Sequence, residues 1–405
     1  MNLFKNLSII ITIYYLKMEK KIYFKSPYNF VQSKTNSIDR IFFLDNFRSF
    51  LIILVVLFHA SLAYIVNADV WFIFNPQKSI IFDVYAFLFD RTIMPMLFFI
   101  SGYFALSSIL KRGTASFLKK RFVKLGIPFI IGIFIVNPFS MYIINLYNNK
   151  ISNNFFNYWF SNYLTNIPFT LHLWFLVSLL IIIILFSITF KFKKSIFKIK
   201  SKSNFSSKFL LIFAFLIGLA LFIINLFISD LEWAGIGGFI IVQPLRFVLY
   251  ISYFFFGVFA FRNKFFSKYN TSNKFLFITM VTIILAVLYT LFYYFFHKDF
   301  SDFLFLKYIN GLLWSFICLC SLMMMIKLFH KRFNFSSKFG QKLSANSYAI
   351  YIFHYPFVIY LQYILINWSI SPIIKFILVI AVSISITYII CEYLLHRIPI
   401  IKKFF

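Results

Sequence analysis

The chain has 405 residues, of which 61% are hydrophobic and 13% are charged, and its mean hydropathy is +0.86. Soluble domains carry about twice that share of charged residues, so the composition excludes a soluble globular protein. The formal net charge of +29 could suggest nucleic-acid binding. However, the basic residues lie in short runs between apolar segments, which is the pattern that sets topology in membranes. We therefore expect a protein of the lipid bilayer that binds no nucleic acid.

The first forty residues contain one short apolar run, 7–16, flanked by lysines. This run is too short to span a bilayer, and no small-residue cleavage site follows it. We therefore expect neither a membrane span nor a signal peptide here, and we interpret residues 1–40 as a basic cytoplasmic segment. Met18 is an alternative start of the chain.

Ten apolar segments follow, each long enough to cross a membrane as an α-helix. The predicted spans are Ile41–Val66, Ile80–Leu110, Phe122–Tyr147, His172–Phe190, Phe209–Ile228, Phe239–Phe261, Phe275–Phe296, Tyr308–Phe329, Ser347–Trp368 and Ile373–Leu395. Pro95 and Gly102 are expected to bend the second span. The remaining segments are too short for a soluble core of their own. Residues 41–396 are therefore predicted to form one all-α bundle of ten transmembrane helices, and residues 397–405 a short basic cytoplasmic tail.

The charges of the connecting segments predict the orientation of this bundle. With a cytoplasmic N-terminus, the inside segments hold 32 of the 40 Lys and Arg residues. The outside loops hold four, namely Lys78, Lys150, Lys298 and Lys307. An excess of positive charge on alternate sides of the spans predicts that both termini are cytoplasmic.

The first span carries three ionisable residues, Asp45, Arg48 and His59. Such residues are unfavourable within a membrane segment and therefore indicate a functional site. At about 100° per residue, all three lie along one stripe of a helix. Arg48 and His59 are separated by roughly 16 Å of helical rise, about half of the hydrocarbon core. The alternative is that Asp45 and Arg48 form only an ion pair at the membrane boundary, while His59 binds a neighbouring carbonyl group.

Three further polar residues lie in or beside spans and are candidates for contact with a substrate: His172, Arg246 and His354. Each has a simpler interpretation. His172 can be an interfacial residue, and His354 can bind a carbonyl group that Pro356 leaves without its helical partner. Arg246, like Arg91, can extend its charged end outward to the membrane surface.

A basic segment, KRGTASFLKKRFVKLGIP, precedes and enters the third span. Arg121 and Lys124 are one helical turn apart, with Lys120 beside them, so they can present cations on one helical face to phosphate groups. The alternative is the ordinary excess of positive charge on the inside of a membrane. The chain has no glycine-rich phosphate loop and no spacing typical of metal ligands, so we expect no bound metal.

Taken together, these motifs resemble the multi-pass membrane acyltransferases of the acyltransferase-3 type. The matching segments occur in one order over roughly residues 40–405: D-x-x-R and F-H-A in the first span, PMLFFISGYF, R-x-x-K-L-x-I-P, HLWFL, SYAIYIFHYP and CEYLLHRIPIIKKFF. The chain looks most like the branch that contains the periplasmic-glucan succinyltransferases. The resemblance implies a protein of the cell inner membrane that transfers an acyl group, acetyl or succinyl, from cytoplasmic acyl-CoA to a hydroxyl of an extracytoplasmic glycan.

The resemblance also implies roles for individual residues. His59 matches the family's catalytic histidine, acting as a general base or as an acyl carrier. Arg48 matches the arginine of the D-x-x-R motif, and Asp45 is expected to hold it in place. Arg121 and Lys124 match the R-x-x-R pair that engages the donor. The lysine keeps the charge but lacks the two-pronged geometry of arginine.

A secondary transporter or lipid-linked sugar flippase is the alternative function. Such a protein would also place Arg, His and Asp on inward-facing stripes of its helices. The sequence contains no pair of Gly- or Pro-interrupted half-helices in matching positions, which would be the usual sign of a transport site. A third interpretation, an inactive sensor, would be expected to have lost His59 and Arg48.

Overall fold

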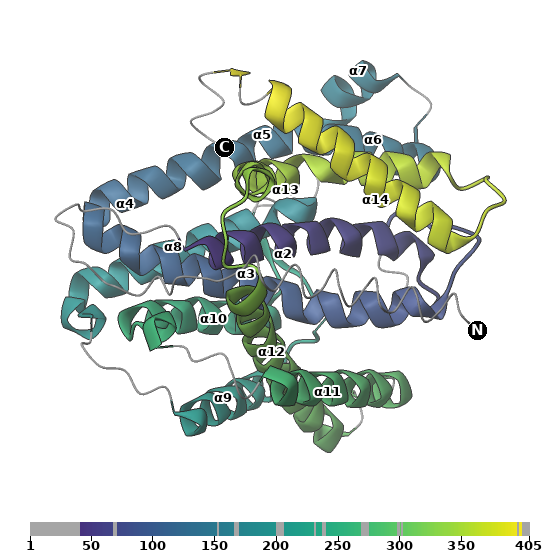
Figure 1. Ribbon diagram of the computed structural model, residues 1–405. Helices are drawn as coiled ribbons and strands as arrows, with labels where there is room; N and C mark the ends of the chain where they lie inside the picture. The colour runs from purple at the N-terminus through teal and green to yellow at the C-terminus, as the bar shows by residue number, and fades with distance from the viewer. Residues whose placement is uncertain are drawn as a thin grey trace, which may run out of the picture. The chain divides into compact units, whose positions relative to one another are not determined.

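The computed structural model describes residues 41–67, 71–151, 154–165, 170–199, 206–230, 232–236, 240–268, 275–297, 300, 303–394 and 397–398. These residues belong to one unit, Ile41–Phe405. Nearly all of its elements are helices (Figure 1). The predicted all-α fold is therefore confirmed. The predicted cytoplasmic segment 1–40 and most of the predicted tail lie outside the described residues.

Nine helical segments of the described chain are long and apolar enough to cross a membrane, as expected for a multi-pass membrane protein. They are α2 (Phe42–Ser61) with the 3-10 turn Leu62–Tyr64; α3 (Ile80–Arg112); the segment Thr114–Tyr147, which contains α4 (Thr114–Arg121), α5 (Ile127–Ile131) and α6 (Asn137–Tyr147); α8 (Trp174–Phe192) with the preceding 3-10 turn Leu171–Leu173; α9 (Ser207–Asn225); α10 (Pro244–Arg262); α11 (Phe275–Phe296); α12 (Leu304–Arg332); and α14 (Pro372–Ile389) with the turn that follows it. A one-turn helix, α7 (Phe155–Asn157), lies between α6 and α8.

The predicted ninth span is a helix, α13 (Lys338–Ile364), but it is not among the nine apolar segments. Several of its polar residues are buried: Ser344, Asn346, Ser347, His354 and Gln362. Because α13 packs against α2, α6 and α14, these side chains face other helices rather than lipid. The helix is therefore present as predicted, whereas its apolarity was overestimated.

Two other predicted spans depart from regular α-helices. In the third, π-helical turns occupy Phe122–Gly126 and Gly132–Val136. A π turn is wider than an α turn and shifts the angular position of the residues that follow. The sixth span was predicted to begin at Phe239, and this boundary is wrong. Strand β2 (Ile240–Val242) pairs antiparallel with β1 (Ala234–Ile236), and α10 begins at Pro244, because proline fits the first turn of a helix and favours an extended residue before it.

Helices α3 and α10 pack unusually closely. A Cβ atom at Gly102 would lie 1.9 Å from the carbonyl oxygen of Phe254, and one at Gly257 would lie 2.0 Å from that of Phe99. Only glycine fits at both positions, as is common where membrane helices meet. Gly102, which was expected to bend the second span, therefore permits a close helix contact, and α3 continues without a break through Pro95.

The segment between α2 and α3 is attached to the bundle at several points. The Asp83 carboxylate accepts hydrogen bonds from two backbone N–H groups just after α2, at 2.8 and 2.7 Å. Lys375, which is fully buried in α14, donates to Asn75 Oδ1 at 3.1 Å and to Gln77 Oε1 at 2.7 Å. This segment carries Trp71 and is thereby held at the His59 end of α2.

Candidate active site

Three histidines from distant parts of the chain meet near the end of α2. His59 lies in the last turn of α2, His354 in α13, and His172 in the 3-10 turn before α8. The distance between ring centroids is 5.2 Å for His59 and His354, 5.3 Å for His172 and His354, and 6.4 Å for His59 and His172. His59, with an exposed fraction of 9%, is the most accessible of the three. Each was predicted singly as a site residue, and the structure brings them together.

The hydrogen bonds indicate which nitrogen of each neutral ring carries the proton. His354 Nδ1 lies 3.0 Å from the carbonyl oxygen of Ile350. A carbonyl oxygen can only accept, so this Nδ1 carries the hydrogen and His354 Nε2 is an acceptor. His59 Nδ1, 2.9 Å from that Nε2, therefore donates to it. The proton of His59 is thus held on Nδ1, and His59 Nε2 keeps an unshared lone pair.

His172 provides a second basic nitrogen beside the first. Its Nε2 lies 3.0 Å from the carbonyl oxygen of Ile352 and donates to it. This carbonyl is the one that Pro356 leaves without a helical partner, so His172 performs the role that the simpler interpretation gave to His354. His172 Nδ1 is buried and has no hydrogen-bond partner among the described residues. With an exposed fraction of 3%, His172 faces the interior of the protein.

Trp71 and Gln362, which the sequence analysis did not single out, position His59. The Trp71 ring stacks on the imidazole at 5.7 Å, and Trp71 Nε1 donates to Gln362 Oε1 at 2.8 Å. Gln362 Nε2 in turn donates to the carbonyl oxygens of His59 and Ala60, at 3.0 and 3.2 Å. Helix α13 thus holds the His59 ring through His354 and its backbone through Gln362. An amide inside a membrane helix is a sequence signal for such a role, whereas a loop tryptophan is not.

Asp45 and Arg48 lie toward the opposite end of α2. Arg48 Nη2 is 3.6 Å from Asp45 Oδ1, so the two residues contact each other as expected. The same nitrogen donates to Ser344 Oγ of α13 at 3.2 Å. The Arg48 side chain has an exposed fraction of 41%. Because α2 is a regular helix, Arg48 and His59 lie on one stripe, separated by roughly 16 Å of rise.

Arg48 belongs to a group that we call the basic cluster: Arg48, Arg112, Lys120, Arg121 and Lys124. Arg121 interacts electrostatically with Arg112 and Arg48, and Lys124 interacts with the other four members. Like charges gathered in this way repel one another and are typical of a site for a multiply charged anion. Lys124 lies in the π turn Phe122–Gly126, so the separation of Arg121 and Lys124 differs from that in a regular α-helix. Its strongest like-charged neighbour is Lys120, four residues before it.

Arg246 lies in a separate group, which we call the ion network: Asp90, Arg91, Asp230 and Arg246. Arg246 Nη1 donates to Asp90 Oδ1 at 2.7 Å. Arg91 Nη2 donates to Asp230 Oδ2 at 3.0 Å, and Arg91 Nε donates to the hydroxyl of Tyr289 at 2.9 Å. The two arginine side chains have exposed fractions of 6% and 4%, so both are buried within the protein. Arg246 is thus paired with an acid of α3.

This arrangement places two basic nitrogens of neutral imidazoles in a largely buried site, and a basic cluster toward the other end of the same helix. A neutral imidazole nitrogen can take a proton from a hydroxyl group near pH 7. Within the described ranges, no group of three or more His, Cys, Asp or Glu residues could hold a metal ion.

A family model described as an acyltransferase domain matches residues 41–392. The match includes the three histidines, Arg48 and the rest of the basic cluster. The comparison with curated proteins and the comparison with solved structures each found no match.

Proposed function

The chain belongs to the acyltransferase-3 family and is a multi-pass membrane acyltransferase, and from this premise we propose that it transfers an acyl group from acyl-CoA to a hydroxyl group. The acyl group is acetyl or succinyl, and the acceptor is an extracytoplasmic glycan, as in the glucan-modifying branch that the sequence resembles. We place the protein in the inner membrane with both termini cytoplasmic. The observation that carries the proposal is the hydrogen-bond chain that leaves His59 Nε2 with its lone pair.

The basic cluster supports acyl-CoA as the donor. Its five cations are suited to the phosphate groups of CoA, and Arg48 and Arg121 add two-pronged hydrogen bonding. The cluster contains Arg112, Lys120, Arg121 and Lys124, all from a segment that the loop charges predict to be cytoplasmic. The rise of roughly 16 Å from Arg48 to His59 is one that the extended pantetheine arm can bridge. The thioester would then reach His59 while the nucleotide stays at the membrane surface.

In the proposed mechanism His59 is the general base. Its Nε2 takes the proton of the acceptor hydroxyl while the hydroxyl oxygen attacks the thioester carbonyl carbon. The tetrahedral intermediate then expels the CoA thiolate, which receives the proton from His59 Nε2, so the products are an ester and free CoA thiol. His354 keeps the other proton on His59 Nδ1 throughout, the orienting role of the third member of a catalytic triad. A positioned general base typically contributes about 10²–10⁴ in rate.

The same lone pair also suits His59 to act as an acyl carrier. In that route Nε2 attacks the thioester carbonyl carbon and CoA leaves as the thiolate. The acyl-imidazolium then passes its acyl group to the hydroxyl oxygen, and the hydroxyl proton goes to the thiolate. The two routes differ in one observable. Incubation with labelled acyl-CoA and no acceptor labels His59 only if the histidine carries the acyl group.

His172 supports an acceptor that is rich in hydroxyl groups. Its Nδ1 is a buried hydrogen-bond acceptor without a partner among the described residues, in a ring 6.4 Å from that of His59. A neighbouring hydroxyl of a sugar can donate to this nitrogen while His59 activates the reacting hydroxyl. His354 then acts through His59, whereas Arg246, paired with Asp90, contributes to the acceptor site only indirectly. Family membership does not favour the alternative of a transporter or flippase.

The test is acyl-CoA-dependent release of free thiol by membranes that contain the wild type or His59→Ala, with and without a periplasmic glycan extract. We expect release that depends on the extract and falls by about 10²–10⁴ in the variant. Equal protein levels and equal thermal stability in detergent serve as the control. Full release by His59→Ala would contradict the mechanism. Solute movement into liposomes without any acyl donor would favour a transporter.

A further inference from the structure

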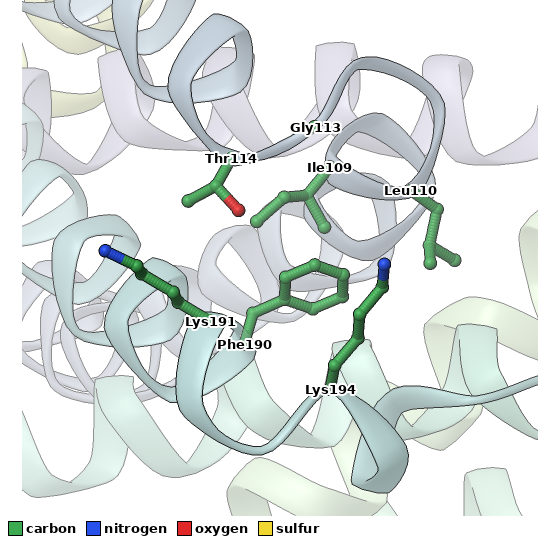
Figure 2. Close-up of a pocket in the computed structure, with 7 residues that line it drawn as sticks. All are labelled: Ile109, Leu110, Gly113, Thr114, Phe190, Lys191 and Lys194. Atoms are coloured by element: carbon green, nitrogen blue, oxygen red, sulfur yellow. The ribbon is translucent and has the colours of Figure 1, made fainter.

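A pocket of about 270 Å³ lies where the end of α3, the beginning of α4 and the end of α8 meet. It is separate from the histidines and is lined by Ile109, Leu110, Gly113, Thr114, Phe190, Lys191 and Lys194 (Figure 2). The two lysines come from the basic segment 191–208, to which neither the fold nor the proposed mechanism assigns a role. The turn that forms the pocket requires Gly113, whose φ of 74° is strained for other residues.

The side chains of the pocket combine apolar groups with positive charge. Figure 2 shows the ring of Phe190 between the side chains of Lys191 and Lys194, with Ile109 close to the ring. The Phe190 ring is only 5% exposed and packs on Phe186 and Phe197, so it contributes one edge to the pocket. Leu110, with an exposed fraction of 41%, provides most of the accessible apolar surface. The two ammonium groups, both on exposed residues, can bind a phosphate group. The hydroxyl of Thr114 adds a hydrogen-bonding group at the beginning of α4.

The pocket adjoins the basic cluster. Arg112, a member of that cluster, directly precedes Gly113, and its charge interacts with that of Arg121. Arg121 interacts in turn with Arg48, the residue of α2 that lies roughly 16 Å along the helix from His59. Three features therefore follow one another: the pocket with its two lysines, the basic cluster, and helix α2, which leads from Arg48 to His59.

Acyl-CoA has its groups in the same order: a 3′-phosphorylated adenosine, a diphosphate, and a pantetheine arm that ends in the thioester. We propose that the pocket binds the 3′-phosphoadenosine end of the donor, with the adenine against Leu110 and the edge of Phe190, and the 3′-phosphate at Lys191 and Lys194. The diphosphate then lies on the basic cluster. This inference rests on the proposed function, in which acyl-CoA is the donor.

An anionic lipid headgroup offers the same phosphate chemistry as the 3′-phosphate. Two features favour the nucleotide: the apolar side of the pocket beside the lysines, and the continuity of positive charge from the pocket to the basic cluster and Arg48. A headgroup would use the lysines but would need neither feature.

The experiment compares acetyl-CoA with acetyl-3′-dephospho-CoA as donors for the wild type and for the double variant Lys191→Gln/Lys194→Gln. The matched control is Lys193→Gln/Lys198→Gln, which removes two lysines of the same segment that do not line the pocket. All four positions are exposed, so folding should be preserved. In the wild type and the control, we expect KM for the dephospho donor to be about tenfold higher than for acetyl-CoA. In the double variant both donors should show the higher KM, with kcat unchanged.

The outcomes separate this inference from the proposed function. If the wild type uses neither of these donors and neither of the corresponding succinyl donors, the proposed function fails and the inference with it. If the wild type transfers acetyl groups but the ratio of the two KM values is the same in the double variant, only the inference fails. The double variant could instead lose activity equally with both donors, by an amount that depends on the anionic lipid content of liposomes that contain the protein. That result would assign the pocket to a lipid headgroup and overturn the inference.

Discussion

The three histidines and the ion network both place polar side chains inside an apolar bundle, but their hydrogen bonds are organised differently. In the ion network each guanidinium is paired with a carboxylate, at 2.7 Å for Arg246 and Asp90 and at 3.0 Å for Arg91 and Asp230. The histidines form no such closed pairs. Their donors are all used, while two acceptor lone pairs remain, one on His59 and one on His172 Nδ1.

This difference separates a structural group from a reactive one. Opposite charges that neutralise each other within the bundle require nothing from a substrate, and removing one partner leaves the other buried and unpaired. One donor of the ion network, Arg246 Nε, is buried without a hydrogen-bond partner among the described residues, but it belongs to a guanidinium that already pairs with Asp90. A buried acceptor without a partner has an energetic cost, so it is expected where a ligand supplies the missing donor. By this criterion the ion network stabilises the contact between α3 and α10, and the histidines carry the chemistry.

Replacing Arg91 with Met should therefore reduce stability rather than catalysis. We expect the free energy of unfolding to fall by roughly 3 kcal/mol, because the Asp230 carboxylate, with an exposed fraction of 15%, is left without its partner. Chemical denaturation in detergent measures the change. The kcat of the folded fraction should stay within about twofold of the wild type. The double variant Arg91→Met/Asp230→Asn should recover part of the stability. An Arg91→Met protein of normal stability that no longer transfers acyl groups would place the network in the catalytic machinery.

Replacing His354 should have the opposite effect, a loss of kcat with little change in stability or KM. His354→Leu removes the acceptor that keeps the proton of His59 on Nδ1, and we expect kcat to fall by about 30-fold, within the usual range for general-base assistance. His354→Gln places an amide oxygen near the position of His354 Nε2, offers it to the same N–H group and should restore part of the loss. Steady-state kinetics on both variants, at matched protein levels, measures the effect. Equal kcat values for the Leu and Gln variants would show that the hydrogen bond to His59 Nδ1 does not orient the ring.

The sequence predicts the membrane helices well, because apolar length and loop charge are local signals. The predicted limits of Phe275–Phe296 coincide with those of α11. The start of the sixth span was misplaced because the apolar residues 240–242 form a strand before Pro244. The apolarity of the sequence does not show that the polar residues of α13 are covered by other helices, because this depends on how the helices pack.

The candidate site could be predicted only in part. Helical periodicity places Asp45, Arg48 and His59 on one stripe, and α2 carries all three in one helix. The approach of His354 to His59 joins residues 295 positions apart and depends on how α13 packs against α2, which no local pattern specifies. The π turn that contains Lys124 has no clear sequence signal either.

The smallest effect that we predict tests whether α13 also positions the backbone of His59. Gln362→Leu removes the acceptor of Trp71 Nε1 and the donor to the His59 carbonyl, so the Trp71 ring should no longer be held against the imidazole. We expect kcat to fall by about fivefold, since the geometry loosens while His59 and its bond to His354 remain. Carbethoxylation of His59, followed by mass spectrometry, should become faster because one face of the ring is uncovered. Gln341→Leu, at an exposed position of the same helix, is the matched control and should change neither quantity. A lower stability of Gln362→Leu with unchanged kcat and unchanged modification of His59 would mean that Gln362 only supports the fold. A combined change in kcat and in the accessibility of His59 would show that the reactive nitrogen depends on α13 at two points, through the ring and through the backbone.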